Sequence, residues 1–132
     1  SGWNDFIWTV PYGNVMNNIK DITDLTKEEF PTLYAVALIL KVEAMHRVAD
    51  VFGPIIYSSF GDLENVGVYD SQQQAYDAFF TDLDTAVTNL MADIDSQRFT
   101  AFDLSYDGNY TQWVKFANSL RLRLAIRISN IP

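Results

Sequence analysis

The sequence predicts an all-α protein built from an array of antiparallel helices. Four segments repeat their apolar residues with a period of about 3.6, and no segment alternates apolar and polar residues as a half-buried strand does. Short links between helical segments favour antiparallel neighbours. With 132 residues, 48% of them hydrophobic and 20% charged, the chain has the size and composition of a single helical domain, residues 1–132.

The first predicted helix covers residues 11–25. Its apolar positions fall on one face, and Pro11 suits the first turn, where a proline loses no helical hydrogen bond. The preceding segment, residues 3–10, is rich in aromatic residues and fits either the end of another helix or an extended arm.

The second predicted helix covers residues 32–52 and is apolar on nearly every side, so we expect it to be mostly buried. Gly53 and Pro54 end it, because glycine tolerates the left-handed conformation and proline cannot continue the backbone hydrogen bonds. Residues 53–70 then form a loop that is long for a compact helical domain, which makes it a candidate functional loop.

The third predicted helix follows Ser71, which together with Gln74 forms a capping box, and it runs to about residue 91. The last helix begins after a cap at Asn109 or Thr111. Its apolar residues recur at spacings of four, three, four and four: Trp113, Ala117, Leu120, Leu124 and Ile128.

The charges are spread unevenly along the chain. The net charge is −8, which disfavours binding to nucleic acid or to anionic lipid headgroups. Residues 60–107 carry ten acidic residues and one basic residue, whereas residues 108–132 carry four basic residues and no acidic one. Packing the basic last helix beside the acidic third helix would bring opposite charges together.

Three arginines, Arg121, Arg123 and Arg127, interrupt the apolar pattern of the last helix. Arg123 and Arg127 lie one turn apart on one flank, while Arg121 faces a different neighbour. They could bind an external carboxylate, phosphate or sulfate. We favour a structural role in which the stems cover apolar surface and the guanidinium groups meet acidic residues or helix-end carbonyls. The candidate acidic partners are Asp77, Asp82 and Asp84.

Residues 103–108, DLSYDG, resemble the opening of a calcium-binding loop, with Asp103, Ser105 and Asp107 at the first, third and fifth positions. Position 12 is Val114 instead of the glutamate that such a loop needs. An Asp-Gly turn before a helix cap explains the pattern better, and a weak calcium site near Asp103 and Asp107 stays as the alternative. We expect no metal ion and no other cofactor.

His46, the only histidine, shares a helical flank with Glu43 and Asp50. An acid–base pair or a metal site could be built from them, but a hydrogen-bonded structural histidine is the more common case. The chain has no cysteine and no GxSxG, HExxH or glycine-rich phosphate motif. A glycosidase acting through paired carboxylates is the weakest hypothesis, and we expect no catalytic residue and no enzymatic activity.

Aromatic residues cluster in or beside the stretches expected to be non-helical, where flat rings could stack on sugars or on partner side chains. The alternative is that most of them pack onto the core. The set contains Trp3, Trp8, Tyr12, Tyr57, Phe60, Tyr69, Tyr106 and Tyr110. As ligand-binding candidates we select Trp3, Trp8, Tyr12 and Tyr57.

Three segments together resemble the SusD/RagB family of starch-binding-type outer-membrane lipoproteins. They are FGPIIYS (52–58), YDSQQQAYDAFFTDLDTAV (69–87) and DLSYDGNYTQWVKFANSLRLRLAIRIS (103–129). The last is the most specific. One departure lies at residues 53–57, GPIIY, where the family usually has Gly-Asp-x-Pro-Tyr.

The resemblance implies a surface-exposed, lipid-anchored protein of the cell outer membrane, built on tetratricopeptide-like helix pairs. Such a protein binds oligosaccharides, or peptides in some members, and passes them to a SusC-like TonB-dependent transporter. Family members are several times longer, so the chain would be a fragment of the helical scaffold, with signal peptide and lipid anchor outside this sequence. Within it, the resemblance marks scaffold positions: Trp113, Asn118, Arg121, Arg123 and Arg127. A scaffold that only contacts the transporter is the alternative to a glycan-binding role.

Overall fold

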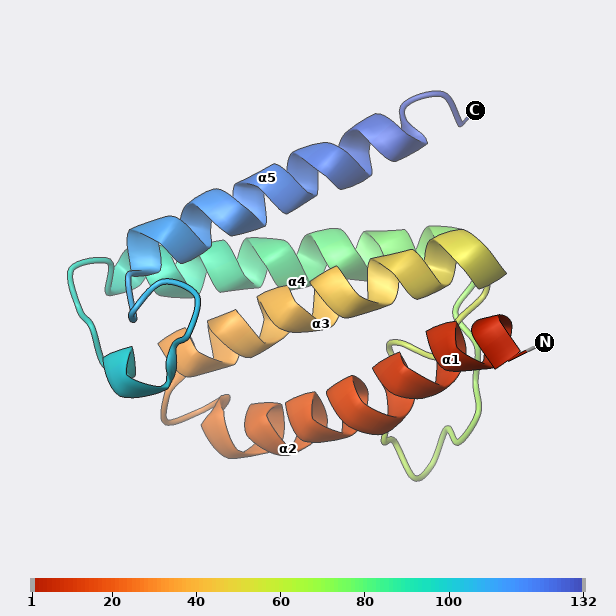
Figure 1. The fold of residues 1–132 in the computed structure, drawn as a ribbon, viewed down its shortest axis with the longest axis horizontal. Helices are drawn as coiled ribbons and strands as arrows, with labels where there is room; N and C mark the ends of the chain where they lie inside the picture. The colour runs from red at the N-terminus through yellow and green to blue at the C-terminus, as the bar shows by residue number, and fades with distance from the viewer. Residues whose placement is uncertain (1, 132) are drawn as a thin grey trace.

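Helices joined by loops make up residues 2–131, the part of the chain that the structure, a computed structural model, describes (Figure 1). In chain order the elements are α1 (Gly2–Val10), a π-helical turn (Pro11–Met16), α2 (Asn17–Thr26), α3 (Pro31–Phe52), α4 (Gln72–Ala92), a 3₁₀ turn (Thr100–Phe102) and α5 (Tyr110–Ile128). In residues 2–131 the β-type pairing is confined to one isolated antiparallel bridge between Ile55 and Asp70. The predicted all-α class is confirmed.

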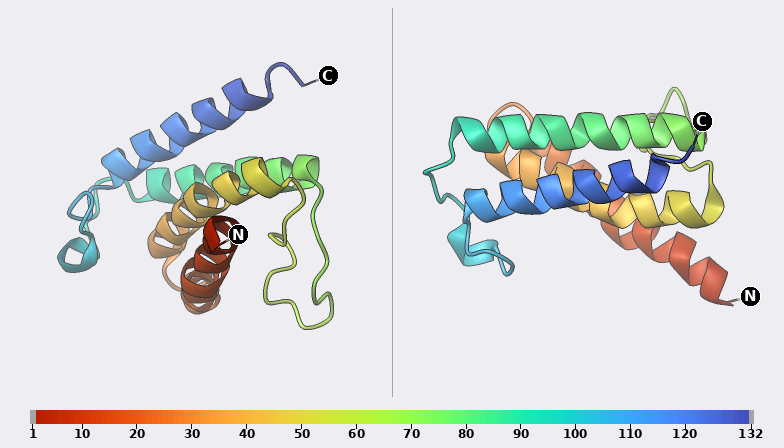
Figure 2. Two further views of the ribbon diagram at one scale, coloured as in Figure 1. Left: turned by 45° about the vertical axis from the view of Figure 1, so that its right-hand side comes forward. Right: turned by 90° about the horizontal axis from the view of Figure 1, so that it is seen from above.

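Successive long helices run in opposite directions and pack as tetratricopeptide-like pairs (Figures 1 and 2). The main contacts are those of α3 with α4, of α4 with α5 and of α2 with α3, whereas α3 and α5 touch only slightly. α3 therefore lies at the centre, which explains why it is buried on several sides. None of the helices in residues 2–131 is both long enough and apolar enough to span a membrane.

The N-terminal helix differs from the prediction in where it begins. The structure places Pro11 inside a continuous helical rod made of α1, the π-helical turn and α2, so the predicted start at residue 11 is wrong. A proline within a helix lacks the N–H of one hydrogen bond, and its ring crowds the carbonyl four residues earlier. A widened π turn at Pro11 accommodates this strain without ending the helix.

The other predicted helix boundaries are confirmed. α3 ends at Phe52 and is capped by Gly53, whose φ of 77° favours glycine and whose N–H donates to the Ala49 carbonyl at 2.8 Å. The capping box at α4 is present, with the Gln74 N–H donating to Ser71 Oγ at 3.2 Å and the Ser71 N–H donating to Gln74 Oε1 at 2.8 Å. At α5 the cap is Asn109, which accepts a hydrogen bond from the Gln112 N–H.

The long loop between α3 and α4 is fixed at its base by side chains. The Tyr12 hydroxyl donates to the Ile56 carbonyl at 2.9 Å and accepts from the Ile56 N–H at 2.8 Å. Burial raises the pKa of Tyr12 to about 12, so the hydroxyl keeps its proton and can donate. The Asp70 carboxylate accepts from the backbone N–H groups of Tyr57 and Ser58. The loop is thereby tied to the N-terminal rod and to the start of α4.

Candidate functional site

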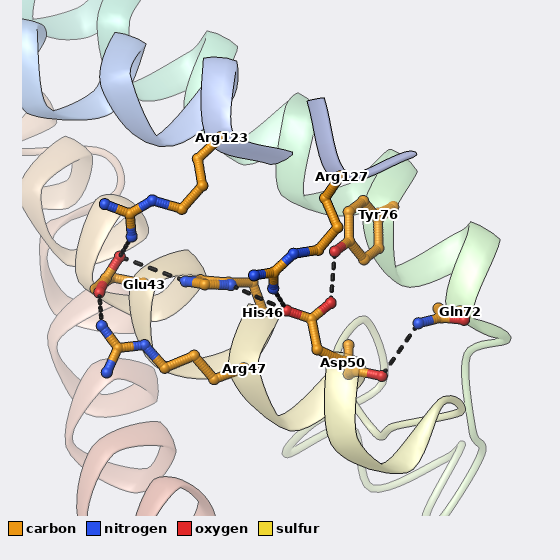
Figure 3. A network of polar contacts seen from close by, with 9 residues as sticks. Glu43, His46, Arg47, Asp50, Gln72, Tyr76, Arg123 and Arg127 are labelled. Atoms are coloured by element: carbon orange, nitrogen blue, oxygen red, sulfur yellow. Dashed lines mark hydrogen bonds and ion pairs between the residues drawn. The ribbon is translucent and has the colours of Figure 1, made fainter. Parts of the chain in front are cut away.

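The three arginines of α5 reach two different helices. Arg121 pairs with Asp84 of α4, with 2.7 Å between Nη2 and Oδ1. Arg123 Nη1 lies 3.8 Å from Glu43 Oε2 of α3, and the Arg127 guanidinium contacts the Asp50 carboxylate of the same helix (Figure 3). Asp84 is thus the one partner that the sequence had suggested.

The expected partners, Asp77, Asp82 and Asp84 of the third helix or helix-end carbonyls, are wrong for Arg123 and Arg127, which meet acidic residues of α3. Both point to α3, and Asp82 instead accepts a hydrogen bond from the Tyr57 hydroxyl at 2.6 Å and pairs with Lys41. The reason is geometric, because α5 lies above the line where α3 and α4 meet (Figure 2). Residues on one side of α5 therefore face α4, and residues on the other side face α3.

His46 lies buried between the two carboxylates that receive these arginines (Figure 3). Its Nε2 is 3.5 Å from Glu43 Oε2 and its Nδ1 is 3.6 Å from Asp50 Oδ2. Burial lowers the pKa of His46 below its ordinary 6.5; Glu43 opposes the shift, while the positive charges of Arg47, Arg127 and Arg123 add to it. His46 is therefore neutral at neutral pH.

The remaining members of this polar cluster bind its two carboxylates from other sides. Arg47, one turn along α3, pairs with Glu43, and the Tyr76 hydroxyl of α4 donates to Asp50 Oδ1 at 2.6 Å. The cluster thus joins α3, α4 and α5 through charged and polar contacts. Both carboxylates are engaged by protein groups, and no hydroxyl nucleophile pairs with His46 among the described contacts. The arrangement suits a structural role better than acid–base chemistry.

Asp103 organises the turn that leads into α5. Its Oδ1 accepts from the N–H groups of Ser105 and Tyr106, and its Oδ2 accepts from the Gly108 N–H at 2.9 Å and from Trp113 Nε1 at 2.7 Å. Burial raises the pKa of Asp103, but these hydrogen bonds outweigh burial and hold it below the ordinary 3.8. Trp113, a scaffold candidate from the sequence, is thereby fixed to the turn.

The calcium interpretation of this turn does not fit the geometry. A cation at Asp103 would have to displace four hydrogen-bond donors from its two oxygens. Asp107 and Gly108 adopt positive φ values of 52° and 73°, as an Asp-Gly turn requires. Across residues 2–131 no three acidic or histidine side chains gather in a way that could hold a metal ion.

The four aromatic candidates have different surroundings. Trp3 is 81% exposed on α1. Trp8 is half-buried against Tyr12 and Phe52, at ring-centroid distances of 4.7 and 5.1 Å. Tyr12 is the half-buried anchor of the long loop.

The structure corrects the predicted set of ligand-binding aromatic residues at Tyr57. It is only 2% exposed, packs edge-on against Phe79 and carries the Lys41 ammonium 4.0 Å above its ring. A side chain so enclosed has no free ring face for a sugar, so Tyr57 belongs to the core. The sequence could not show this, because the burial depends on how the loop folds back onto α4.

Tyr69 was in the wider aromatic set but was not selected. It is 53% exposed and stacks on Trp8, with ring centroids 6.3 Å apart and an interplanar angle of 23°. Its position just before the capped start of α4 could have indicated an exposed ring. The stack on Trp8 could not be predicted, because it forms only where the loop folds back to the N-terminal rod. Asn118, the remaining scaffold candidate, lies on the exposed side of α5.

The fold and these clusters define an antiparallel array of tetratricopeptide-like helix pairs with a shared apolar core and polar contacts between the helices. The family model described as "SusD-like: SusD and RagB outer membrane lipoprotein" matches residues 1–132. The chain therefore belongs to the SusD-like family of outer-membrane lipoproteins, as its motifs indicated. A search of curated proteins gave no match.

Solved structures show the same relationship. A chitin-binding SusD homologue from Flavobacterium johnsoniae is 49% identical with a TM-score of 0.93, over 98% of this chain and 28% of its own. SusD homologues from Bacteroides vulgatus (39%, TM-score 0.90) and Bacteroides thetaiotaomicron (35%, TM-score 0.88) match 100% and 97% of this chain, and 28% and 27% of their own. The chain thus spans somewhat over a quarter of the length of these relatives.

Proposed function

We propose that the chain is part of the helical scaffold of a longer SusD-like protein that binds oligosaccharide noncovalently at the cell surface. In this proposal the whole protein is held in the outer membrane by a lipid anchor and delivers its ligand to a SusC-like TonB-dependent transporter. The observation that supports it most is the 49% identity, over nearly the whole chain, to a SusD homologue that binds chitin. The role is binding without catalysis.

The exposed aromatic rings of the N-terminal rod and the long loop are the proposed sugar contacts. Trp3 has an exposed ring, and the exposed ring of Tyr69 stacks on the half-buried ring of Trp8. Tyr12 supports this stack by holding the base of the loop. Sugars bind such rings through their apolar C–H faces, while their hydroxyls find hydrogen bonds elsewhere.

Calorimetry on the full-length protein tests this function, using soluble chitin oligosaccharides, starch oligosaccharides and short peptides as ligands. Trp3→Ala and Tyr69→Ala should each weaken oligosaccharide binding by about 3- to 10-fold, the range expected for one aromatic contact. Phe102→Ala, in the 3₁₀ turn before α5 and about as exposed as Trp3, is the control and should leave binding unchanged.

The other outcomes separate the remaining hypotheses. Binding of peptides alone would replace the oligosaccharide by a peptide ligand. No binding of any ligand by the full-length protein, together with a stable complex with the transporter, would favour a purely structural scaffold. Release of reducing sugar would contradict the noncatalytic proposal.

A further inference from the structure

An apolar groove runs along the face between the N-terminal helical rod and α3. Its volume is about 640 Å³. One wall carries Val15 and Ile22, seven residues apart, and the other carries Leu40, Ala44 and Val48 at successive spacings of four. Each wall is thus a ridge of side chains along one face of a helix, and the two ridges flank a common channel.

The groove leaves large apolar side chains open to solvent. Phe6 is 60% exposed, Leu40 44% and Ile22 40%. The charged residues of its lining are Glu43 and Arg47, and these pair with each other. Glu43 is the only acidic residue in this lining, although the chain has a net charge of −8. An exposed apolar groove of this kind is typical of a site that binds a partner or a ligand.

The chemistry of the lining favours a helix over a sugar. An oligosaccharide would bury hydroxyl groups against aliphatic side chains, where few polar partners are present to accept or donate hydrogen bonds. An amphipathic helix buries its own apolar ridge and needs no polar partner in such a groove. Arrays of helix pairs are stabilised by the same stacking of one helix on the next.

We propose that an amphipathic helix from a part of the same polypeptide outside these 132 residues fills the groove. The inference shares with the proposed function the premise that the chain is part of a longer SusD-like protein. The length of the relatives supports this occupant: the whole of the described fold matches only 28% of the Flavobacterium johnsoniae chain, so most of that chain lies outside the match. The occupying helix carries apolar residues at i, i+3 or i+4, and i+7 on the face that enters the groove.

Cysteine labelling in the full-length protein tests the proposal. Residues 1–132 contain no cysteine, so a labelled peptide from this part of the chain, identified by mass spectrometry, reports the introduced site alone. Asn18→Cys places a thiol at an exposed position in the groove lining. Thr88→Cys, exposed on α4, is the control. If the groove is filled, maleimide should modify Asn18→Cys about 100-fold more slowly in the native than in the unfolded protein, because labelling then requires local opening. Thr88→Cys should be slowed only a few-fold.

A photo-cross-linker attached to Asn18→Cys then identifies the occupant by mass spectrometry. A cross-link to a peptide of the same chain outside residues 1–132 is the expected result. Native labelling of Asn18→Cys at the rate of the control, cross-links between two copies, or protection that appears only with oligosaccharide bound would each overturn the proposal.

Calorimetry on the same labelled protein keeps the two proposals separate. Protection of Asn18→Cys without oligosaccharide binding would leave this inference standing and remove the proposed function. Oligosaccharide binding with an open groove would do the reverse.

Discussion

Asp103 is the residue on which the start of α5 depends most directly. Its side chain is buried, and its two oxygens satisfy three backbone N–H groups of the turn and the indole of the buried Trp113. Buried donors that lose their acceptor pay the full cost of desolvation, which exceeds the net gain of an ordinary hydrogen bond. One carboxylate therefore fixes both the turn and the first buried side chain of the helix.

Replacing Asp103 by asparagine should lower the free energy of unfolding by about 2–4 kcal/mol, because an amide cannot accept from all four donors. Urea denaturation measures this. Asp95→Asn, at an exposed position in the preceding loop, should change stability by less than about 0.5 kcal/mol.

Since the folded pKa of Asp103 lies below 3.8, its stabilising effect is complete above that pH and is lost as pH falls through the folded value. Equal stability of the two variants would contradict the assigned role.

A second residue-level prediction concerns two glycines with nearly the same backbone angle. The backbone at Gly108 (φ 73°) and at Gly67 (φ 74°) has a conformation that favours glycine. A Cβ atom added to Gly108 would lie 2.9 Å from Thr100 Oγ1, whereas a Cβ atom added to Gly67 would meet no atom within 4 Å. Gly67→Ala should cost about 1 kcal/mol from backbone strain, and Gly108→Ala about 3 kcal/mol because packing against the 3₁₀ turn is also lost. Thermal unfolding of both variants compares them, and equal losses would mean that the turns do not pack this closely.

At the scale of elements, α5 is attached to the array by two kinds of contact. An apolar stripe, including Leu120 and Leu124, packs into the common core. Charged contacts are added on either side, through Arg121 to α4 and through Arg123 and Arg127 to α3. These two sides differ in burial, because Asp50 is mostly enclosed while Asp84 is mostly exposed. The free energies of the pairs should differ accordingly.

Substitution of each arginine by methionine tests this difference while keeping the apolar stem. Arg127→Met should lower the free energy of unfolding by about 1–2 kcal/mol, because it leaves the enclosed Asp50 without its guanidinium partner. Arg121→Met removes a surface pair and should cost no more than about 0.5 kcal/mol. Urea denaturation in low salt and in 0.5 M salt provides the measurement; a larger loss for Arg121→Met would refute the assignment of the stronger contact to α3.

At the scale of the whole molecule, the array is closed in its centre and open at its faces. α3 carries most of the core, while the groove beside the N-terminal rod and the outer side of α5, with Leu122 and Ile126, leave apolar residues exposed. This distribution is expected of helix arrays, in which each layer covers its neighbour and the outermost layers need a further one.

The stability of the whole helical array should depend on pH through His46. Because its folded pKa lies below 6.5, the neutral form stabilises the fold fully above pH 6.5, and stability falls as pH drops below that value. The groups around the imidazole are Glu43, Arg47 and Asp50 of its own helix, Arg123 and Arg127 of α5, and Tyr76 of α4, which binds Asp50.

Urea denaturation between pH 7.5 and 5.5 checks this prediction, since the chain has no other histidine. The wild-type free energy of unfolding should decrease with a slope of at most about 1.4 kcal/mol per pH unit, the limit for one proton. His46→Gln should show no such decrease in this range. Identical slopes in both proteins would assign the pH dependence to other groups.

The sequence by itself determined the helices from α3 onward, the capping box at Ser71 and the family, and it narrowed the cap of α5 to Asn109 or Thr111. These features depend on local rules: apolar periodicity, capping side chains and the conformations open to glycine and proline act within a few residues of each other. Pro11 shows where local rules fail. Its preference for a first helical turn predicted a helix start at this residue, but Pro11 lies in a π-helical turn inside a longer helical rod.

Only the tertiary structure decided which helix each arginine meets, that Tyr57 is core while Tyr69 is exposed, and that Asp103 binds Trp113. Each of these depends on how elements far apart in the chain are rotated and packed against each other. A helical face is readable from the sequence, but the neighbour that it meets is set by the packing angle of whole helices, and a difference of part of a turn on α5 separates a contact with Asp84 from one with Glu43 or Asp50.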